Sequence, residues 1–147
     1  MSKKNPTAVV TDSVEIHVPF HDVDPAGVVW HGHYFKYFEI ARCKMLEKIN
    51  YNYNHMRDSG YFWPVVDSNV RYRKPAFYDQ TISVEARLIE WELRLMIDYI
   101  IRDADDDVLV RGRTIQVAVR HEGWEMMLGS PEVLLDCVNR YLESQSS

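Results

Sequence analysis

Near the N-terminus, hydrophobic and polar residues alternate one by one, which is the period of a half-buried strand. The hydrophobic positions are Val14, Ile16, Val18 and Phe20. Pro19 has no backbone N–H for a strand ladder, so it marks a sheet edge or a strand end. Residues 1–12 are mostly polar and show no period, so we expect a loose arm there and regular structure from about Ser13.

Between Gly32 and Asn50 the spacing of hydrophobic residues changes to three and four, which is typical of one face of a helix. The residues on this stripe are Tyr34, Phe38, Ala41, Met45 and Ile49. The pattern therefore predicts one amphipathic helix of about 19 residues, about 28 Å long.

Strand-like alternation returns after a polar connection and continues for most of the remaining chain. The expected strands cover residues 62–74, 82–88, 93–101 and 108–120. In the last of them the hydrophobic residues change parity around Gly112, which indicates a bulge or a sharp bend. Ser130 and Pro131 provide a helix cap and first turn for a short C-terminal helix.

This order of elements favours an antiparallel sheet over repeated strand-helix-strand units, because the later strands are joined by short turns. A helix of about 28 Å matches the width of five or six strands spaced about 4.8 Å apart. We therefore predict an α+β fold in which a curved antiparallel sheet wraps around one central helix. A single domain is expected over residues 13–147.

Composition and charge narrow the class of protein. The chain has 147 residues, of which 46% are hydrophobic, so it has the size of one globular domain. Its net charge of −5 argues against a nucleic-acid binder. It shows neither a signal peptide nor an apolar stretch of about 18 residues, and Cys43 and Cys137 suggest free thiols. We expect a cytoplasmic protein that does not insert into membranes.

The densest run of reactive residues connects the first strand to the long helix. Asp24 is held by Pro25 on a loop that turns at Gly27 and reaches the helix start near His31 and Gly32. Backbone N–H groups at a helix start lack partners, so they can stabilise an oxyanion close to a carboxylate. The residues alone favour a simpler alternative, in which Asp24 caps an Asp-Pro turn.

A metal site is disfavoured in this segment. His31 and His33 are two positions apart at a helix start and point in different directions. No carboxylate completes a ligand set at the usual spacing. We expect neither a metal nor a cofactor.

The segment from Asp22 to Tyr34, continued from Tyr37 to Arg42, carries a long motif. It reads D-x-D-x-x-G-x-V, an aromatic-His pair with a tyrosine, and then an acidic residue followed by A-R. This motif resembles the signature of the 4-hydroxybenzoyl-CoA thioesterase-like group of hotdog-fold acyl-CoA thioesterases. The resemblance covers about residues 13–121.

The resemblance implies hydrolysis of an acyl-CoA or acyl-carrier-protein thioester to a carboxylic acid and a free thiol. The catalytic carboxylate falls on Asp24, as a nucleophile or as a general base. The oxyanion donors fall near His31 and Gly32, and Gly27 lets the loop pass close to the thioester. His31 either orients the carbonyl or a water, or only bonds to backbone.

Aromatic and basic residues complete the expected substrate site. Trp30, Tyr34 and Trp63 belong to an aromatic cluster that is mostly core but could line an acyl channel. Arg73 and Lys74, in the densest basic cluster, either bind coenzyme A phosphates or form a solvated face. One relative carries a run of basic residues after a tryptophan that Trp91 resembles, and only Arg94 matches that run here. A carrier-protein thioester, which contains no nucleotide, is therefore an alternative substrate.

In the family the cleft is shared between subunits, so the resemblance implies a homodimer or homotetramer. Two other functions are compatible with the same fold. One is a hydroxyacyl-thioester dehydratase, which would use a histidine with an acidic residue on the long helix. The other is a non-catalytic acyl-CoA-binding module, in which Asp24 would be a turn residue.

Overall fold

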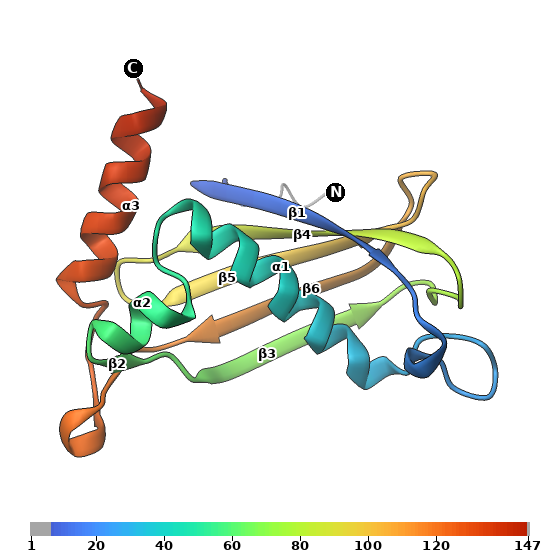
Figure 1. Cartoon of the computed structure of the whole chain (residues 1–147), viewed down its shortest axis with the longest axis horizontal. Coiled ribbons are helices and arrows are strands. Elements are labelled where there is room, and N and C mark those ends of the chain that lie inside the picture. Colours follow the sequence, from blue (N-terminus) through green and yellow to red (C-terminus); the bar gives the residue numbers. More distant parts are fainter. Residues whose placement is uncertain (1–6, 147) are drawn as a thin grey trace, which may run out of the picture.

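A five-stranded antiparallel sheet crossed by one long helix forms the body of the protein (Figure 1). The computed structural model describes residues 7–146. In the order in which they pair, the strands are β1 (Val10–His17), β4 (Thr81–Glu90), β5 (Leu95–Arg102), β6 (Val108–Gln116) and β3 (Val65–Tyr72). The helix is α1 (Tyr34–Lys48). The predicted α+β arrangement is confirmed.

Shorter elements surround this body. They are the 3-10 helices η1 (Phe20–Asp22), η2 (His31–His33) and η3 (Glu122–Trp124), the helices α2 (Tyr53–Asp58) and α3 (Glu132–Gln145), and the strands β2 (Tyr61–Phe62), β7 (Val119–Arg120) and β8 (Glu125–Met126). The last three form a second sheet in the order β2-β7-β8. Among residues 7–146, no helix is both long and apolar enough to cross a bilayer.

The core lies between α1 and the inner face of the five-stranded sheet. All five positions of the predicted stripe are buried: Tyr34, Phe38, Ala41, Met45 and Ile49. The helix is shorter than predicted, because its first turn is the separate helix η2 and because Asn50, with a φ of 56°, ends it. Burial of the stripe holds the helix start at one end of the sheet.

The first strand begins earlier than expected. Val10 is buried and pairs with Leu88, and the register continues through residues 11 and 12. Residues 10–12 therefore belong to β1, not to a loose arm. Residues 1–6 of the expected arm lie outside the described residues.

Three features of the connections differ from the sequence prediction. The expected strands 62–74 and 108–120 each divide into two. In both segments the chain passes between the small sheet and the large one, from β2 to β3 and from β6 to β7. Both crossings occur together, at a hydrogen bond from Val117 N–H to the Pro64 carbonyl (3.4 Å). The polar connection after α1 contains the unpredicted helix α2, where Asn52 and His55 form a capping box.

The predicted bulge at Gly112 is wrong. Gly112 pairs with Val70 and Tyr99 in an unbroken register. A Cβ at this position would lie 2.6 Å from ring carbons of Phe38, and that ring stacks on Tyr99 at a centroid distance of 4.4 Å. Glycine is needed because the helix packs directly on the strand here.

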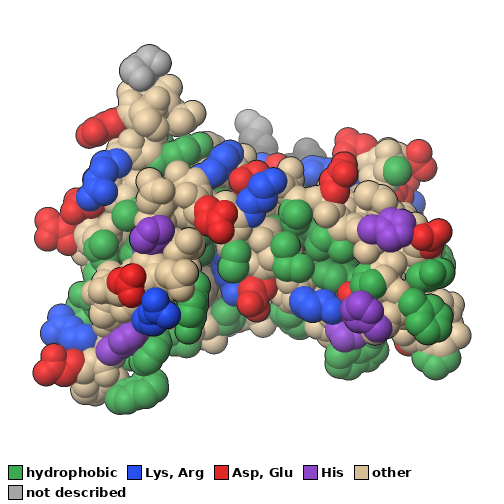
Figure 2. Space-filling view, viewed as in Figure 1, with side chains coloured by type: hydrophobic (Ala, Val, Ile, Leu, Met, Phe, Trp, Pro, Cys, Tyr) green, Lys and Arg blue, Asp and Glu red, His purple; other side chains and the backbone are tan. Residues whose placement is uncertain are grey.

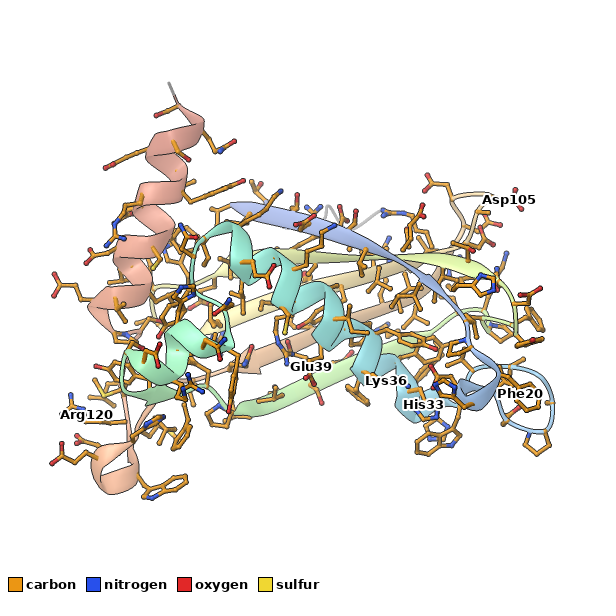
Figure 3. All side chains as sticks on the ribbon, in the orientation of Figure 1. Phe20, His33, Lys36, Glu39, Asp105 and Arg120 are labelled. Atoms are coloured by element: carbon orange, nitrogen blue, oxygen red, sulfur yellow. The ribbon has the colours of Figure 1, made fainter. Side chains whose placement is uncertain are left out.

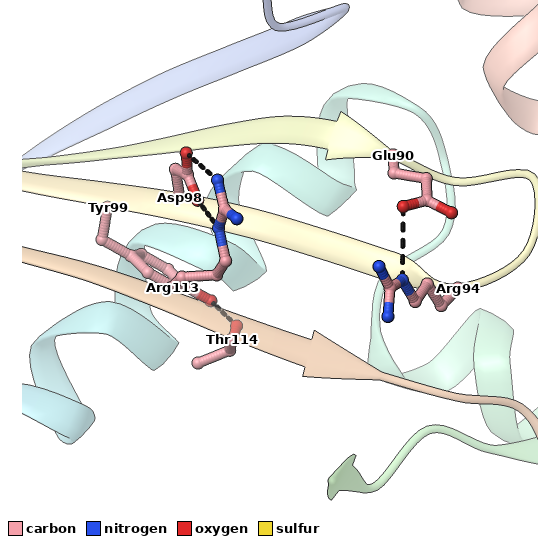
Figure 4. Close-up of polar contacts among 6 residues, drawn as sticks. All are labelled: Glu90, Arg94, Asp98, Tyr99, Arg113 and Thr114. Carbon is pink, nitrogen blue, oxygen red and sulfur yellow. Dashed lines mark hydrogen bonds and ion pairs between the residues drawn. The ribbon is translucent and has the colours of Figure 1, made fainter. Parts of the chain in front are cut away.

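The parity change around Gly112 comes from polar residues on the inner face of β6. Thr114 and Gln116 are buried there, and the Thr114 hydroxyl hydrogen-bonds Tyr99 Oη at 2.7 Å (Figure 4). On the outer face, Arg113 donates two hydrogen bonds to Asp98, at 2.6 and 3.1 Å. The inner face is therefore partly polar where α1 crosses it.

We expect Gly112→Ala to destabilise the fold by about 1–3 kcal/mol, because the added methyl overlaps a buried ring that cannot move away from Tyr99. Urea denaturation measures the change. Gly129→Ala is the matched control, since its Cβ would meet the Glu92 carbonyl oxygen at an ordinary 3.7 Å. Equal stability of the two variants would contradict this account of Gly112.

Candidate active site

The Asp22 carboxylate joins the loop before α1 to the first turn of that helix. It is 2% exposed and accepts hydrogen bonds from Lys36 Nζ at 2.5 Å and from Tyr37 Oη at 2.7 Å. Its backbone carbonyl accepts the N–H of Trp30 at 3.0 Å. Figure 3 shows Lys36 and His33 at the helix start, beside this loop. Asp22 therefore ties both ends of the loop, residues 22 and 30, to the first turn of α1.

The partners of Asp22 keep it charged. Burial by itself raises the pKa of the Asp22 carboxyl, but the hydrogen bonds from Lys36 and Tyr37 and the charge of Lys36 together hold that pKa below its ordinary value. Burial, together with the hydrogen bond to Asp22, raises the pKa of the Tyr37 phenol. The pair is thus a carboxylate and a neutral phenol.

Asp24 closes the turn that the Asp-Pro pair predicts. Its Oδ1 accepts the N–H of Ala26 at 2.9 Å, and its own N–H donates to the Val28 carbonyl at 2.8 Å. Gly27, at a φ of 82°, donates to the Asp24 carbonyl at 2.9 Å. The turn-capping contact is therefore present, and it fixes a half-buried carboxylate.

The loop is also attached to the connection between β3 and β4. Val29 N–H donates to the Ala76 carbonyl at 2.8 Å, and Tyr78 N–H donates to the Gly27 carbonyl at 3.1 Å. Tyr34, the first residue of α1, accepts the Ala76 N–H on its hydroxyl at 3.1 Å. These bonds hold the Asp24 turn and the helix start in one rigid unit.

The helix start begins with η2, whose first N–H groups belong to His31 and Gly32. The first N–H groups of a helix have no intrahelical acceptor. The Trp30 indole lies over Gly32, and any side chain at that position would overlap the ring. The same indole contacts the His31 ring at a centroid distance of 4.9 Å.

A cavity of about 280 Å³, which we call the helix-start cavity, opens beside η2. Its lining includes the predicted residues His31, Tyr34, Arg73 and Lys74, together with Tyr72. The Tyr72 hydroxyl donates to the His31 carbonyl at 3.0 Å. Asp24 does not line this cavity, because its side chain is turned back toward Ala26.

A second cavity of about 280 Å³, the mid-helix cavity, lies between the middle of α1, α2 and the start of β3. Glu39 and Arg42 line it from α1, and Trp63 and Gln116 line it from the opposite side. Trp63 is therefore separated from the other predicted site residues. Arg42 donates to the Tyr99 hydroxyl at 3.3 Å, so it reaches into the core.

The third predicted basic residue lies far from the Asp24 loop within one chain. Arg94 stands in the turn between β4 and β5, where its Nε pairs with Glu90 at 3.2 Å (Figure 4). That turn is at the end of the sheet near α3, whereas the Asp24 loop is at the other end (Figure 1). Lys74, in the helix-start cavity, pairs with Asp107 at 3.6 Å.

Sequence reasoning missed several lining residues, among them Tyr72 and Gln116. Tyr72 looked like an ordinary apolar strand position, and Gln116 had no signal, because only the tertiary structure turns it inward. Among residues 7–146, no group of three or more His, Cys, Asp or Glu side chains is arranged to hold a metal ion.

Comparison with known proteins gives consistent matches. Residues 18–134 match the model of the thioesterase-like superfamily. An acyl-CoA thioesterase of Haemophilus influenzae is 27% identical over 135 residues, which cover 86% of this chain and 80% of that protein. A candidate esterase of Aquifex aeolicus is 38% identical over 73 residues, which are 50% of this chain and only 57% of that protein.

The fold is shared with solved structures. The crystal structure of a DHNA-CoA thioesterase from Staphylococcus aureus superimposes with a TM-score of 0.80 at 26% identity. The match covers 92% of this chain and 91% of that chain.

We expect Asp22→Asn to cost about 1–3 kcal/mol at neutral pH, since a neutral amide replaces the buried carboxylate that accepts hydrogen bonds from Lys36 and Tyr37. The folded pKa of Asp22 is lowered, so its stabilisation is present above the unfolded pKa and is lost as the pH falls through the folded pKa. The difference between wild type and variant should therefore shrink below about pH 4. Urea denaturation across this pH range measures it.

Asp58→Asn is the control for this measurement, because the Asp58 side chain is 70% exposed. It should change stability little at either pH. A difference for Asp22→Asn that is as large at low pH as at pH 7 would contradict the charged state assigned to Asp22.

Proposed function

Because this chain belongs to the thioesterase-like superfamily, we propose that it hydrolyses acyl-CoA thioesters to a carboxylic acid and a free thiol, with Asp24 as the catalytic carboxylate. The predicted membership of the hotdog-fold 4-hydroxybenzoyl-CoA thioesterase-like group is confirmed. The observation that carries the proposal is the rigid unit that holds the Asp24 turn and the start of α1 together.

In the proposed reaction, the second oxygen of Asp24 acts, since Oδ1 is engaged by Ala26. As a nucleophile, it would attack the thioester carbonyl carbon and expel the thiolate, and water would then hydrolyse the mixed anhydride. As a general base, it would take a proton from a water that attacks the same carbon, and the thiol would leave. Both routes need the carboxylate unprotonated and held in place.

Negative charge develops on the carbonyl oxygen in either route. The N–H groups of His31 and Gly32 are the proposed donors, because they lead a helix whose first turn carries partial positive charge. Trp30 packs over Gly32 and fixes this turn. His31 lines the helix-start cavity, where its imidazole can orient the carbonyl or a water.

Arg73 and Lys74 also line the helix-start cavity, which suits them to a phosphate. Coenzyme A and carrier-protein thioesters both contain a phosphopantetheine arm, so these residues can serve either substrate. Arg94 is paired with Glu90 at the other end of the sheet. It could reach a nucleotide at the Asp24 loop only from a second subunit.

We propose that the active protein is at least a homodimer, joined along β3. This strand is an edge of the large sheet, and all its residues but Val70 are exposed. Val66 is 52% exposed and Tyr72 is 48% exposed, although both are apolar. Figure 2 shows hydrophobic atoms at the surface along the lower rim of the molecule, the side on which Figure 1 places β3. An exposed edge strand of eight residues that carries apolar side chains is usually covered.

A second copy of β3 fits this edge better than an unrelated strand does. β3 is regular from Asp67 to Tyr72, after a bulge at Val66. Antiparallel pairing about a two-fold axis at Asn69 therefore places Asp67 of one copy opposite Arg71 of the other, and the axis repeats this pair. The edge is complementary to itself in charge.

Asp24→Asn should fold normally and lose about 10²–10⁴ in kcat, the usual range for a positioned acid-base group. Thiol release from a panel of acyl-CoAs measures the loss. Asp22→Asn is the control, and it should affect stability more than chemistry. Near wild-type turnover by folded Asp24→Asn would exclude Asp24 as the catalytic group. Binding of acyl-CoA by the wild-type protein without any thiol release would favour the non-catalytic module.

We expect Asp67→Arg to raise the dissociation constant of the dimer at least about tenfold, which corresponds to ~1.4 kcal/mol. The reason is that it sets like charges opposite each other at both ends of the strand pair. The double variant Asp67→Arg with Arg71→Asp restores the pairing and should recover association. Sedimentation over a concentration series tests both. A wild-type monomer at micromolar concentration would refute the shared edge.

A further inference from the structure

The two N–H groups proposed as oxyanion donors belong to successive peptide units at the start of η2, which continues into α1. The N–H of His31 shares a peptide with the Trp30 carbonyl, and the N–H of Gly32 shares one with the His31 carbonyl. Neither N–H has a backbone acceptor among the described residues, 7–146. A peptide unit is planar, so whatever holds its carbonyl also sets the direction of its N–H.

The two carbonyls are held in different ways. The Trp30 carbonyl accepts the His33 N–H at 2.9 Å, within the turn itself. The His31 carbonyl accepts the Tyr72 hydroxyl at 3.0 Å, across a separation of 41 residues. The direction of the Gly32 N–H therefore depends on a side chain of β3.

Packing holds the Tyr72 ring in place. Tyr72 pairs with Val110 of β6, and β3 ends at the same end of the sheet as the start of α1 (Figure 1). The centroid of the Tyr72 ring lies 5.6 Å from that of Tyr34 and 6.3 Å from that of His31. Tyr34 is itself held by the N–H of Ala76. The hydroxyl thus reaches the His31 carbonyl from a ring that has neighbours on two sides.

The Tyr72 hydroxyl is the donor in this contact. A carbonyl has no proton to give, so the proton of the bond comes from the phenol. Burial raises the pKa of the Tyr72 phenol, so the group stays neutral at ordinary working pH. While the bond is made, its proton is committed to the His31 carbonyl and not to a substrate.

Resting on the proposed thioesterase function, we infer that Tyr72 is a positioning residue that aims the Gly32 N–H at the oxygen of the reacting carbonyl. The carbonyl and the N–H of a trans peptide point in opposite directions. With the His31 carbonyl directed at Tyr72, the Gly32 N–H is directed out of the N-terminal end of the helix. The same hydrogen bond polarises the peptide and makes its N–H a stronger donor.

This aim matters most in the transition state. The oxygen of a thioester carbonyl gains negative charge only as the carbon is attacked, so a well-directed donor stabilises the transition state more than the bound substrate. Loss of the aim should therefore lower kcat and leave KM unchanged. The Gly32 N–H itself remains, so the loss should be smaller than the about 10²–10³ that follows removal of an oxyanion donor.

The test variant is Tyr72→Phe, which keeps the ring and removes the hydroxyl. Tyr72 is 48% exposed, so the variant should fold. Thiol release is measured with the acyl-CoA that the wild-type protein hydrolyses fastest. We expect kcat to fall about three- to tenfold, with KM within about twofold of the wild-type value. The pH profile of kcat should keep its shape, because Tyr72 transfers no proton.

Tyr141→Phe is the matched control. It removes the same hydroxyl from α3, which lies at the other end of the sheet from η2 (Figure 1). It should leave both kcat and KM unchanged.

A second measurement does not depend on turnover. Loss of the hydrogen bond at the His31 carbonyl makes the peptide less polarised, so the ¹⁵N resonance of the Gly32 amide should move upfield in an NMR spectrum. The movement is expected in Tyr72→Phe and not in Tyr141→Phe.

An unchanged kcat in Tyr72→Phe overturns the inference, even if the Gly32 resonance moves, because the contact then has no part in the reaction. A fall in kcat without movement of that resonance also overturns it, because the hydroxyl then acts elsewhere. A rise in KM alone would make Tyr72 a substrate-binding residue instead. These three results leave the proposed function standing. Absence of thiol release from every acyl-CoA by the wild-type protein would refute that function, and this inference with it.

Discussion

The charged hydrogen bonds of Asp22 are the constraint on which the candidate site depends. A buried carboxylate is stable only when it is paired, and here Lys36 and Tyr37 pair it from the first turn of α1. The backbone of the same residue holds Trp30. One side chain thereby ties the end of the loop to the beginning of the helix. The Asp24 turn and the leading N–H groups of η2 cannot move independently once this contact forms.

The packing of α1 on the sheet sets where empty space remains. Phe38 lies directly on Gly112 and stacks on Tyr99, so the helix and sheet are in close contact there. Beyond that contact, the inner face of β6 carries Thr114 and Gln116 in place of large apolar residues. The helix does not fill the space above Gln116, and the mid-helix cavity results. The mid-helix cavity therefore begins where the inner face of β6 becomes polar, next to the tight contact between Phe38 and Gly112.

Much of the fold could be read from periodicity. The stripe from Tyr34 to Ile49 contains enough apolar area to identify its buried face without any tertiary information. Residues 10–12 were missed because only Val10 in that segment is fully buried. The prediction of a bulge at Gly112 was wrong because the sequence does not show why a strand contains a glycine. A glycine that makes room for an aromatic ring, as Gly112 does for Phe38, has the same local pattern as a glycine at a bulge.

The sequence by itself determined the antiparallel α+β architecture, the family motif and the local turn at Asp24, because these follow from residues close together along the chain. Only the tertiary structure decided which side chains share a cavity. Tyr72 meets His31, and Gln116 meets Trp63, across separations of 41 and 53 residues. It also placed the turn between β4 and β5, which carries Arg94, at the opposite end of the sheet from the loop before α1 (Figure 1). Such contacts depend on strand order and register, and those are set by the burial of the whole helix face, not by any short segment.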